Sequence, residues 1–539
     1  MSTASTANTL DEPRLTWPLP GILAARARAH GAAVCLIDAV TGEEETYEGL
    51  LSAAGRVAHG LTQLGIEPGD TVATMITHSL DTYRVWFGLT HIGVLEVPLS
   101  TRYKGHMLRH VLEDSGARAV ILDEVFLDEL VAVLEGAPLP RLRWVVVRGT
   151  HDAAGVPSSV DVLRLDEIGA SSTAGDRGEE DWERLPHELS MVLYTSGTTG
   201  ASKGVLVPWG QVGSVAAGAF PEGTHQDGDV LYCPFPPNHI GGRLFPAIGI
   251  RHGLPVVIRE SFSASEFWRD IERHHCTTAP LVSAMANILW RAPADERDGR
   301  TPLRNVLMLP VIDEFRQFEE RFGVRICTVF NMTEISIALQ SGWEVEDPRS
   351  CGRVRVGPPG YELRLVDDND WEVEPGQVGE LVCRTEEPWT LNAGYFGRPE
   401  QTAAAWRNGW FHTGDAFRRD DAGRYYFVDR IKDAIRRRGE NVSSFEVERE
   451  VRDHPEVVDC AAIGVPSPLG EEDIKLFAVT VADSTLTEAD VIAHVAAKAP
   501  SFMVPTFVEF VPDLPRTQAT ERVRKAELRD SQGGASRVE

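Results

Sequence analysis

The sequence has no long apolar run and few basic residues for its length. None of its 539 residues belongs to a run of about 18 consecutive apolar residues, so we expect no membrane-spanning helix. Lysine and arginine number 53 against 80 acidic residues, which gives a formal charge of −27. Such a chain is repelled by phosphate backbones and anionic lipid headgroups. We therefore expect neither nucleic acid nor a membrane surface as its partner.

Cysteine is scarce and scattered. The seven cysteines never form a Cys-x-x-Cys pair, which argues against a disulfide framework or a zinc site and for a reducing compartment. Residues 1–17 are polar and carry acidic groups, and they lack the basic start and apolar run of a secretory signal. These absences together predict a cytoplasmic protein.

The overall composition of the chain is typical of a globular protein. Hydrophobic residues make up 42% and charged residues 25%. A chain of this length exceeds what one hydrophobic core usually serves, so we expect two or more domains.

The first half alternates between helical and strand patterns. Residues 53–64 form an amphipathic pattern that Gly65 should end, residues 71–76 are typical of a strand, and residues 80–91 of a helix. This alternation predicts α/β layers with largely parallel strands. Residues 148–188 are rich in glycine, serine, aspartate and proline, and we expect a surface connection there.

The second half has a different texture. Short strands separated by Gly and Pro turns begin near residue 352 and predict a β subdomain over 352–430. A compact βαβ-like pattern follows, with helices over 445–454 and 488–499 and strands over 457–465 and 476–481. We place a domain boundary near residues 429–432 and expect the end of the chain, residues 531–539, to be disordered.

A dense group of hydroxyls and glycines follows a strand-like run in the middle of the chain. It comprises Thr195, Ser196, Gly197, Thr198, Thr199, Gly200 and Lys203. Glycines let backbone N–H groups approach an anion, hydroxyls add donors and the lysine adds a charge, which suits a polyphosphate. A Walker P-loop is excluded because Ser202 precedes the lysine instead of following it. A flexible surface loop would have a similar composition.

This segment resembles the phosphate loop of the adenylate-forming superfamily, which includes acyl-CoA synthetases, peptide-synthetase adenylation domains and luciferases. Further segments resemble the superfamily's other motifs in the correct order. They are Phe330-Asn331-Met332-Thr333-Glu334, Gly379-Glu380-Leu381, Gly394-Tyr395, the run 409–415 (Gly-Trp-Phe-His-Thr-Gly-Asp), the run 429–433 (Asp-Arg-Ile-Lys-Asp) and the run 438–442 (Arg-Gly-Glu-Asn-Val). The resemblance runs from about residue 30 to residue 530.

The resemblance implies both a fold and an activity. The fold would be α/β, with a large N-terminal adenylating domain of several subdomains over 1–430 and a small mobile α+β C-terminal lid domain over 431–530. The activity would be AMP-forming ligation, in which a small-molecule acid attacks ATP and its AMP anhydride is passed to coenzyme A. ATP and Mg²⁺ would be required, with coenzyme A as co-substrate.

The resemblance also implies roles for single residues. Thr333 and Lys203 would contact the phosphates, Glu334 would hold Mg²⁺, Asp415 would bind both ribose hydroxyls and Arg430 would reach the ribose. Two further expectations concern motion and the acid: Lys432 would be the pivot of the C-terminal domain, and His239, with Val311 and Met332, would line the acid pocket. The residue types fit this chemistry, because Mg²⁺ takes oxygen ligands and a carboxylate can accept two ribose hydroxyls. Taken singly, Glu334 and Asp415 could equally serve a helix start or a turn.

The sequence departs from the superfamily pattern in three places. A lysine that bridges acid and α-phosphate is replaced by Arg522, or by Glu521 if the segment is anchored on Pro515; arginine keeps the charge but is planar and bulkier. Lys525 could take part of that role. Residues 307–311 (Leu-Met-Leu-Pro-Val) replace a small-residue segment near the adenine, and Asn331 stands at a nucleotide-binding position where glycine is usual.

These features are most similar to the carnitine-CoA-ligase-like branch, whose substrates vary, and carnitine is not inferred as substrate. Two alternatives keep the fold: activation of nitrite to diazotise an aryl amine, and loading of a carrier protein, both known from antibiotic and other natural-product biosynthesis. A third is a nucleotide-binding relic without turnover. The frequency of dimers among oligomers is the only ground for expecting a homodimer.

Overall fold

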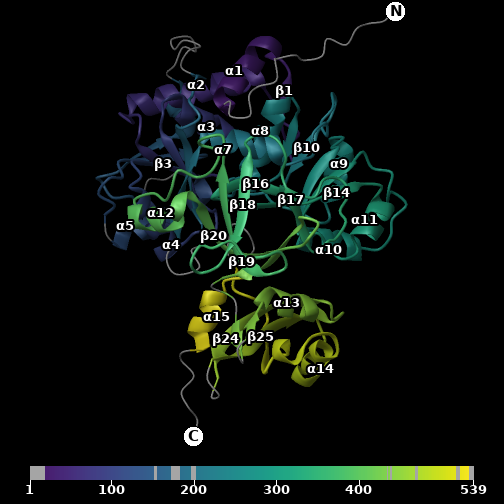
Figure 1. The fold of residues 1–539 in the computed structure, drawn as a ribbon. Coiled ribbons are helices and arrows are strands. Elements are labelled where there is room, and N and C mark those ends of the chain that lie inside the picture. Colours follow the sequence, from purple (N-terminus) through teal and green to yellow (C-terminus); the bar gives the residue numbers. More distant parts are fainter. Residues whose placement is uncertain are drawn as a thin grey trace, which may run out of the picture. The chain divides into compact units, whose positions relative to one another are not determined.

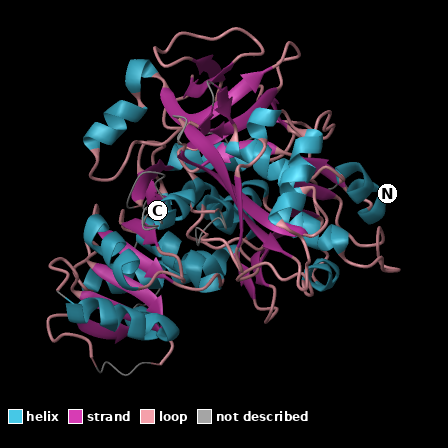
Figure 2. Cartoon of the chain, turned by 90° about the horizontal axis from the view of Figure 1, so that it is seen from below, coloured by secondary structure: helices cyan, strands magenta, loops and turns pink. Residues whose placement is uncertain are grey.

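The structure is a computed structural model and describes residues 18–136, 138–150, 155–170, 182–195, 202–431, 433, 435–437, 440–467, 471–516 and 523–532. These residues form two compact units. The first runs through the described residues up to Thr195 and continues over Ser202–Glu362 and Arg384–Trp406. The second takes Leu363–Cys383 and the described residues from Arg407 onward. Figure 2 shows helices packed against strands and not gathered into separate bundles.

The first unit contains two seven-stranded sheets, each parallel except for one edge strand. One has the order β14-β13-β12-β10-β11-β1-β2. Its strands are β1 (Val34–Asp38), β2 (Glu44–Thr46), β10 (Leu231–Cys233), β11 (Val256–Ile258), β12 (Thr278–Val282), β13 (Asn305–Leu309) and β14 (Arg325–Cys327). The other has the order β7-β6-β5-β3-β4-β8-β9. Its strands are β3 (Thr71–Met75), β4 (Leu95–Pro98), β5 (Ala119–Asp123), β6 (Trp144–Arg148), β7 (Asp161–Arg164), β8 (Leu189–Thr195) and β9 (Lys203–Pro208).

Helices connect and cover these strands (Figure 1). They are α1 (Leu19–His30), α2 (Tyr47–Gln63), α3 (Leu80–His91), α4 (Gly105–Ser115), α5 (Leu127–Gly136), α6 (Leu165–Ala170), α7 (Trp209–Gly218), α8 (Ile240–His252), α9 (Phe267–Arg273), α10 (Ser283–Arg291), α11 (Phe315–Phe322) and α12 (Pro399–Ala405). Three further strands of this unit, β15 (Val329–Met332), β16 (Ile335–Gln340) and β17 (Ser350–Val354), form an antiparallel run. The predicted α/β layers are thus confirmed, because βαβ connections require parallel strands with helices on their faces.

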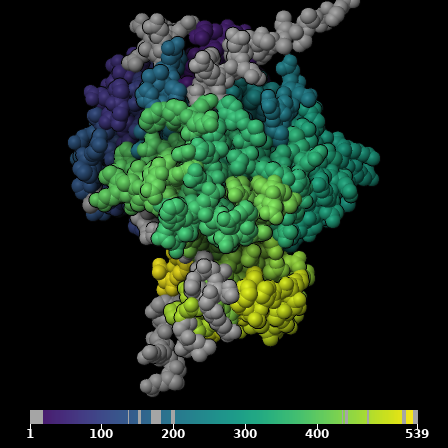
Figure 3. Space-filling model, viewed as in Figure 1, coloured from purple at the N-terminus to yellow at the C-terminus, as the bar shows by residue number. Residues whose placement is uncertain are grey.

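The interior of the first unit is apolar and consists of several hydrophobic clusters. Trp86 on α3 and Trp209 on α7 are fully buried and stack with ring centroids 5.5 Å apart. They belong to the largest hydrophobic cluster, which also takes residues from α1 and α8. The space-filling view shows the side chains that cover one face of the first unit (Figure 3).

The second unit contains antiparallel strands and a small three-stranded sheet packed with helices. Its strands are β18 (Tyr361–Val366) and β19 (Val378–Thr385), of which residues 361–362 and 384–385 are assigned to the first unit, then β20 (Phe411–Arg419), β21 (Tyr425–Arg430), β22 (Ile435–Arg437), β23 (Glu440–Val442), β24 (Val457–Pro466), β25 (Glu472–Thr480) and β26 (Phe507–Phe510). Its helices are α13 (Ser444–Arg452), α14 (Glu488–Lys498) and α15 (Lys525–Gln532). β25, α14 and β26 form a parallel βαβ unit, beside which β24 pairs antiparallel.

Several local predictions agree closely with these bounds and one is wrong. The helix expected over 80–91 is α3, and the strand expected over 71–76 is β3. The surface connection expected over 148–188 contains β7, which pairs with β6, and the helix α6. Residues 161–164 alternate too briefly to be recognised as a strand, and pairing at the sheet edge supplies their order. Within the described part of the chain, no helix is both long and apolar enough to cross a membrane.

Candidate active site

The two ends of the predicted phosphate loop are held together by a strand pair. Thr195 ends β8 and Lys203 begins β9, and the two residues are partners in the antiparallel register. The predicted loop residues Ser196, Gly197, Thr198, Thr199 and Gly200 lie outside the described residues. The ladder therefore fixes both ends of the loop, as the sequence pattern of strand, loop and Val205 predicts.

A short segment around Tyr395 runs along β9. Backbone hydrogen bonds join Phe396 to Gly204 at 2.8 Å and Leu206 to Gly394 at 2.9 Å. This pairing places the Tyr395 ring beside the first residue of β9, so that the Lys203 ammonium lies 3.5 Å from the ring centroid. A cation over an aromatic face is attracted by the ring's negative charge distribution.

The same tyrosine contacts the predicted magnesium ligand. The Tyr395 hydroxyl donates a hydrogen bond to Glu334 Oε1 at 3.3 Å, and Glu334 is only 6% exposed. Lys203, Tyr395 and Glu334 therefore form one contiguous group, which we call the Lys203–Tyr395–Glu334 cluster. Sequence patterns had supplied its two ends as site residues, whereas the Gly394-Tyr395 pair had been noted without a role.

The turn that carries Glu334 is held by two amide side chains. Gln211 Nε2 donates to the Thr333 carbonyl at 2.9 Å, and Asn392 Nδ2 donates to the Glu334 carbonyl at 2.8 Å. The backbone N–H of Asn392 also donates to that carbonyl at 3.0 Å. Asn331 and Met332, which precede this turn in β15, are partly buried. Neither Gln211 nor Asn392 stands in a pattern that sequence reading could have found.

The residues present fit a magnesium ion held mainly by phosphates. Among the described residues, no group of three or more His, Cys, Asp or Glu side chains forms a metal cluster. Mg²⁺ is commonly held by one or two carboxylates together with substrate phosphates and water, which Glu334 beside Lys203 would allow. Such a site needs no protein cage.

The two predicted ribose residues are neighbours in the second unit. Asp415 in β20 and Arg430 in β21 are cross-strand partners, and Arg430 Nε lies 3.0 Å from Asp415 Oδ1. Asp415 is 2% exposed, whereas the Arg430 side chain is 26% exposed. The strand pair thus presents a carboxylate and a guanidinium at one point of the sheet.

Glu380 fixes the turn that leads into Asp415. Glu380 Oε1 accepts a hydrogen bond from the Gly414 backbone N–H at 2.9 Å, and Glu380 Oε2 lies 2.8 Å from His412 Nδ1. The Thr413 hydroxyl donates to the Leu381 carbonyl at 2.7 Å. Gly414 has φ +71°, a left-handed conformation that favours glycine. The Gly379-Glu380-Leu381 motif is therefore the support of the 409–415 motif.

His239 caps the helix α8. Its Nδ1 accepts a hydrogen bond from the Gly241 backbone N–H at 3.1 Å, which leaves the ring proton on Nε2. Burial lowers the pKa of His239 to about 4, so the imidazole is neutral at physiological pH. A neutral ring with an Nε2–H donor can recognise a polar group of an acid without adding charge.

The other predicted pocket residues lie at related places in the fold. Val311 follows β13 and His239 follows β10, two parallel strands of one sheet, so both lie at its carboxyl edge, where α/β sheets commonly bind ligands. Val311 is 9% exposed and packs in the core cluster with Ile312 and Phe315. Met332 ends β15, directly before Thr333.

Two predicted catalytic residues, Lys432 and Arg522, lie outside the described residues. Lys525, which could have replaced the missing lysine, is engaged within the second unit. Its ammonium lies 2.7 Å from Glu448 Oε1 and donates to Ser444 Oγ at 2.5 Å. Burial raises the pKa of the neighbouring Asp429, whose carboxylate accepts from Ser444. These contacts join Lys525, the first residue of α15, to α13.

The chain matches known proteins along most of its length. The pattern of the AMP-binding enzyme family matches residues 23–396, and that of the AMP-binding enzyme C-terminal domain matches residues 446–520. A crotonobetaine/carnitine–CoA ligase of Proteus mirabilis is 30% identical over 490 residues, covering 89% of this chain and 92% of the relative. The corresponding ligase of Salmonella typhimurium is 29% identical over 486 residues, covering 89% and 92%.

Solved structures share the fold. The anthranilate CoA ligase AuaEII in complex with anthranoyl-AMP superposes with a TM-score of 0.83 at 23% identity, covering 97% of this chain and 98% of the other. ATP-bound MatB from Rhodopseudomonas palustris gives a TM-score of 0.78 at 24% identity, covering 96% and 99%. Family patterns, relatives and fold agree with the order of the motifs, and the chain therefore belongs to the AMP-binding enzyme family.

Proposed function

We propose that this protein is an ATP-dependent, AMP-forming acid–CoA ligase. An acid carboxylate attacks the α-phosphorus of ATP and pyrophosphate leaves; the thiolate of coenzyme A then attacks the acyl carbon and AMP leaves. The observation that carries the proposal is the Lys203–Tyr395–Glu334 cluster, which places a cation over the face of the Tyr395 ring and a buried carboxylate at its hydroxyl group.

The cluster suits the first half-reaction. Negative charge spreads over phosphate oxygens as pyrophosphate leaves, and a fixed ammonium such as Lys203 stabilises it without reorganisation. Glu334 would hold Mg²⁺, which when bound neutralises phosphate charge. Thr333 and the loop 195–200 would add hydroxyl and N–H donors, and Asn331 would border the nucleotide.

Ribose binding is assigned to the second unit. Asp415 would accept hydrogen bonds from the ribose hydroxyls, and Arg430, 3.0 Å from it, would donate to the sugar. Glu380 would act as a positioning residue, because it holds both His412 and Gly414 just before Asp415.

The acid is assigned to the carboxyl edge of the sheet β14–β2, beside His239, Val311 and Met332. We assign residues 1–430 to an adenylating domain and residues 431–530 to a lid domain that turns about Lys432 between the half-reactions. Arg522 would take the place of the bridging lysine. The CoA acceptor is supported by relatives named crotonobetaine/carnitine–CoA ligase and anthranilate CoA ligase.

The test is acid-dependent exchange of labelled pyrophosphate into ATP by the full chain, with Mg²⁺ and without coenzyme A. Exchange that requires one acid establishes the adenylating half-reaction. Adding coenzyme A should then convert that acid to a thioester, detected by mass. Absence of exchange with every acid of a broad aryl and aliphatic panel would contradict the proposal.

A further inference from the structure

A fully buried ion pair joins the two halves of the first unit. Arg243 Nη2 in α8 lies 2.7 Å from Glu96 Oε1 in β4, and both side chains are 1% exposed. β4 belongs to the sheet that carries the phosphate loop, whereas α8 follows β10 of the other sheet. The two residues stand 147 positions apart in the sequence.

Stability alone does not account for this pair. Removing two charges from water is costly, and a well-packed apolar pair of similar volume is commonly as stable or more so. Glu96 Oε2 and Arg243 Nη1 are buried without a hydrogen-bond partner among the described residues, so part of that cost is left uncompensated. Such a pair does fix the orientation of its two side chains, because charge-assisted hydrogen bonds require a specific geometry.

The orientation of Arg243 in this pair places its guanidinium against the loop 234–239. Arg243 Nε donates to the Pro237 carbonyl at 2.8 Å, two residues before His239. The guanidinium lies 4.7 Å from the centroid of the Trp86 ring. On the other side, the Thr74 hydroxyl donates to the same Glu96 oxygen at 2.7 Å. Arg243 is thereby held from β3, β4 and α3, and it holds the loop.

The first turn of α8 transmits this placement to His239. The Gly242 N–H donates to the His239 carbonyl at 3.0 Å, and the Tyr83 hydroxyl donates to the Gly242 carbonyl at 2.7 Å. A Cβ on Gly242 would lie 2.2 Å from the Pro236 carbonyl oxygen, so loop and helix are in close contact. A shift of the Arg243 guanidinium therefore moves the loop and its histidine together.

We infer that the Glu96–Arg243 ion pair is a positioning device for the acid pocket, which sets the affinity for the acid and not the affinity for ATP. The inference rests on the proposed function, because it takes His239 to border the acid. Arg243 of the pair bonds the loop 234–239, whereas the Lys203–Tyr395–Glu334 cluster is held by Gln211 and Asn392. Acid binding and nucleotide binding are thus supported by separate contacts.

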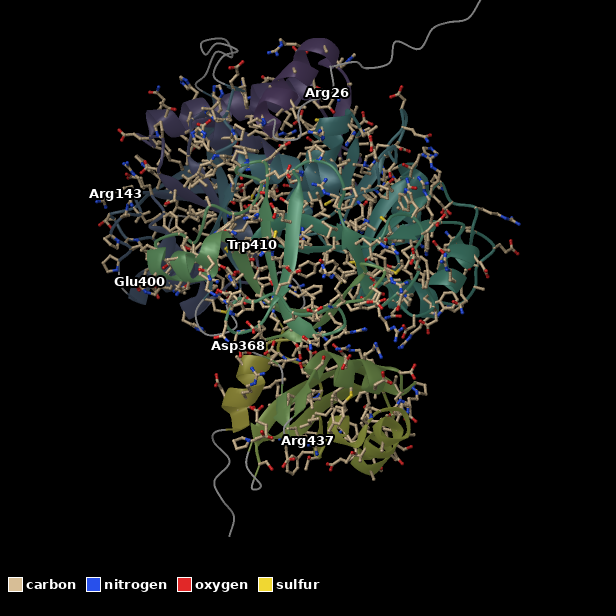
Figure 4. The ribbon with its side chains drawn as sticks, in the orientation of Figure 1. Arg26, Arg143, Asp368, Glu400, Trp410 and Arg437 are labelled. Atoms are coloured by element: carbon tan, nitrogen blue, oxygen red, sulfur yellow. The ribbon has the colours of Figure 1, made fainter. Side chains whose placement is uncertain are left out.

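The same helix offers a matched control. Arg26 in α1 (Figure 4) is 4% exposed, and its guanidinium donates to the Ile250 carbonyl at 3.3 Å and the Arg251 carbonyl at 2.7 Å. It is a buried arginine that bonds backbone at the opposite end of α8, away from the loop.

The experiment compares the double variant Glu96→Leu/Arg243→Met with Arg26→Met in the full chain. The double variant replaces both charges and so leaves no buried charge without a partner; a thermal melt verifies that it folds. We expect the KM for the acid in pyrophosphate exchange to rise about tenfold or more in the double variant, with the KM for ATP changed by less than about twofold. Arg26→Met should leave both KM values near those of the parent.

A second readout does not depend on activity. Amide hydrogen exchange of residues 234–242 should accelerate in the double variant, whereas in Arg26→Met acceleration should be confined to the C-terminal end of α8. If amide hydrogens of residues 234–242 exchange in the folded double variant at the same rate as in the parent, the inference is overturned. So would equal changes of the KM values for acid and ATP. If no acid supports pyrophosphate exchange by the parent protein, the proposed function fails. Amide hydrogen exchange then still decides whether the ion pair holds the loop.

Discussion

The Tyr395 hydroxyl donates a hydrogen bond to Glu334 at 3.3 Å while the Lys203 ammonium lies 3.5 Å from the centroid of the same ring. Three segments far apart in the sequence thereby meet through one side chain. The tyrosine orients a carboxylate that would otherwise lie buried beside an apolar strand. A mutation of Tyr395 should therefore show the effect of losing the orientation of Glu334 while Glu334 itself is still present.

We expect Tyr395→Phe to lower kcat/KM for pyrophosphate exchange about tenfold, because a hydrogen bond to a charged group is worth about 1.5–3 kcal/mol. The ring remains beside Lys203, so the lysine keeps its contact. Tyr426→Phe is a matched control, since its hydroxyl donates to Asp420 Oδ2 at 3.0 Å outside the cluster. Equal activity of Tyr395→Phe and the parent would show that Glu334 needs no such support.

Glu334→Gln should raise the Mg²⁺ concentration needed for half-maximal exchange by about tenfold or more, because an amide oxygen is a weaker ligand for a hard cation than a carboxylate. The measurement is a Mg²⁺ titration at fixed ATP. Glu346→Gln, whose carboxylate pairs at the surface with Arg353 at 3.0 Å, should leave the titration unchanged. An unshifted titration in Glu334→Gln would remove the residue from the metal site.

Glu380→Gln should raise the KM for ATP about fivefold, since the amide nitrogen cannot accept one of the two hydrogen bonds that hold His412 and Gly414. Asp415→Asn should raise it further, because that change alters the residue assigned to the ribose itself. Glu372→Gln, in the segment between β18 and β19 and 3.8 Å from its arginine partners, is the control. A larger effect from Glu372→Gln than from Glu380→Gln would contradict the assigned support of the turn.

The α/β layers of the fold could be predicted from the sequence, because long segments with periodic apolar residues bury one face. The helix over 80–91 and the strand over 71–76 were predictable because each buries apolar side chains in the core of the first unit. The strand over 161–164 was not predictable, because its order comes from pairing with β6.

The motifs could suggest candidate site residues where chemistry requires a residue type, as at Lys203, Glu334 and Asp415, whose roles stay predictions. Gln211 and Asn392 were not, because they act through single hydrogen bonds to the backbone of the turn at 333–334. Glu96 and Arg243 were not, because partners 147 positions apart leave no local pattern.

Acid should destabilise the fold through His78. Burial lowers the pKa of His78 to about 4 from the ordinary 6.5, so between these values the unfolded chain binds a proton that the folded chain does not. The free energy of unfolding therefore falls as pH decreases through this window, by about 1.4 kcal/mol per pH unit for one histidine. Thermal midpoints across the window should fall less steeply in His78→Gln than in the parent. An identical slope in both proteins would assign the acid sensitivity to other groups.

The most direct measurement of the central claim is AMP released from ATP and Mg²⁺ across aryl and aliphatic acids, including amino-aryl acids, each with coenzyme A, with a carrier protein, with nitrite or with none of these. We expect that one acid gives AMP in an amount that rises with coenzyme A and equals the amount of thioester formed. AMP that appears with nitrite and an amino-aryl acid but ignores coenzyme A would contradict it and point to nitrogen–nitrogen bond formation. ATP binding with no AMP from any combination would contradict it as well and leave a nucleotide-binding protein without turnover.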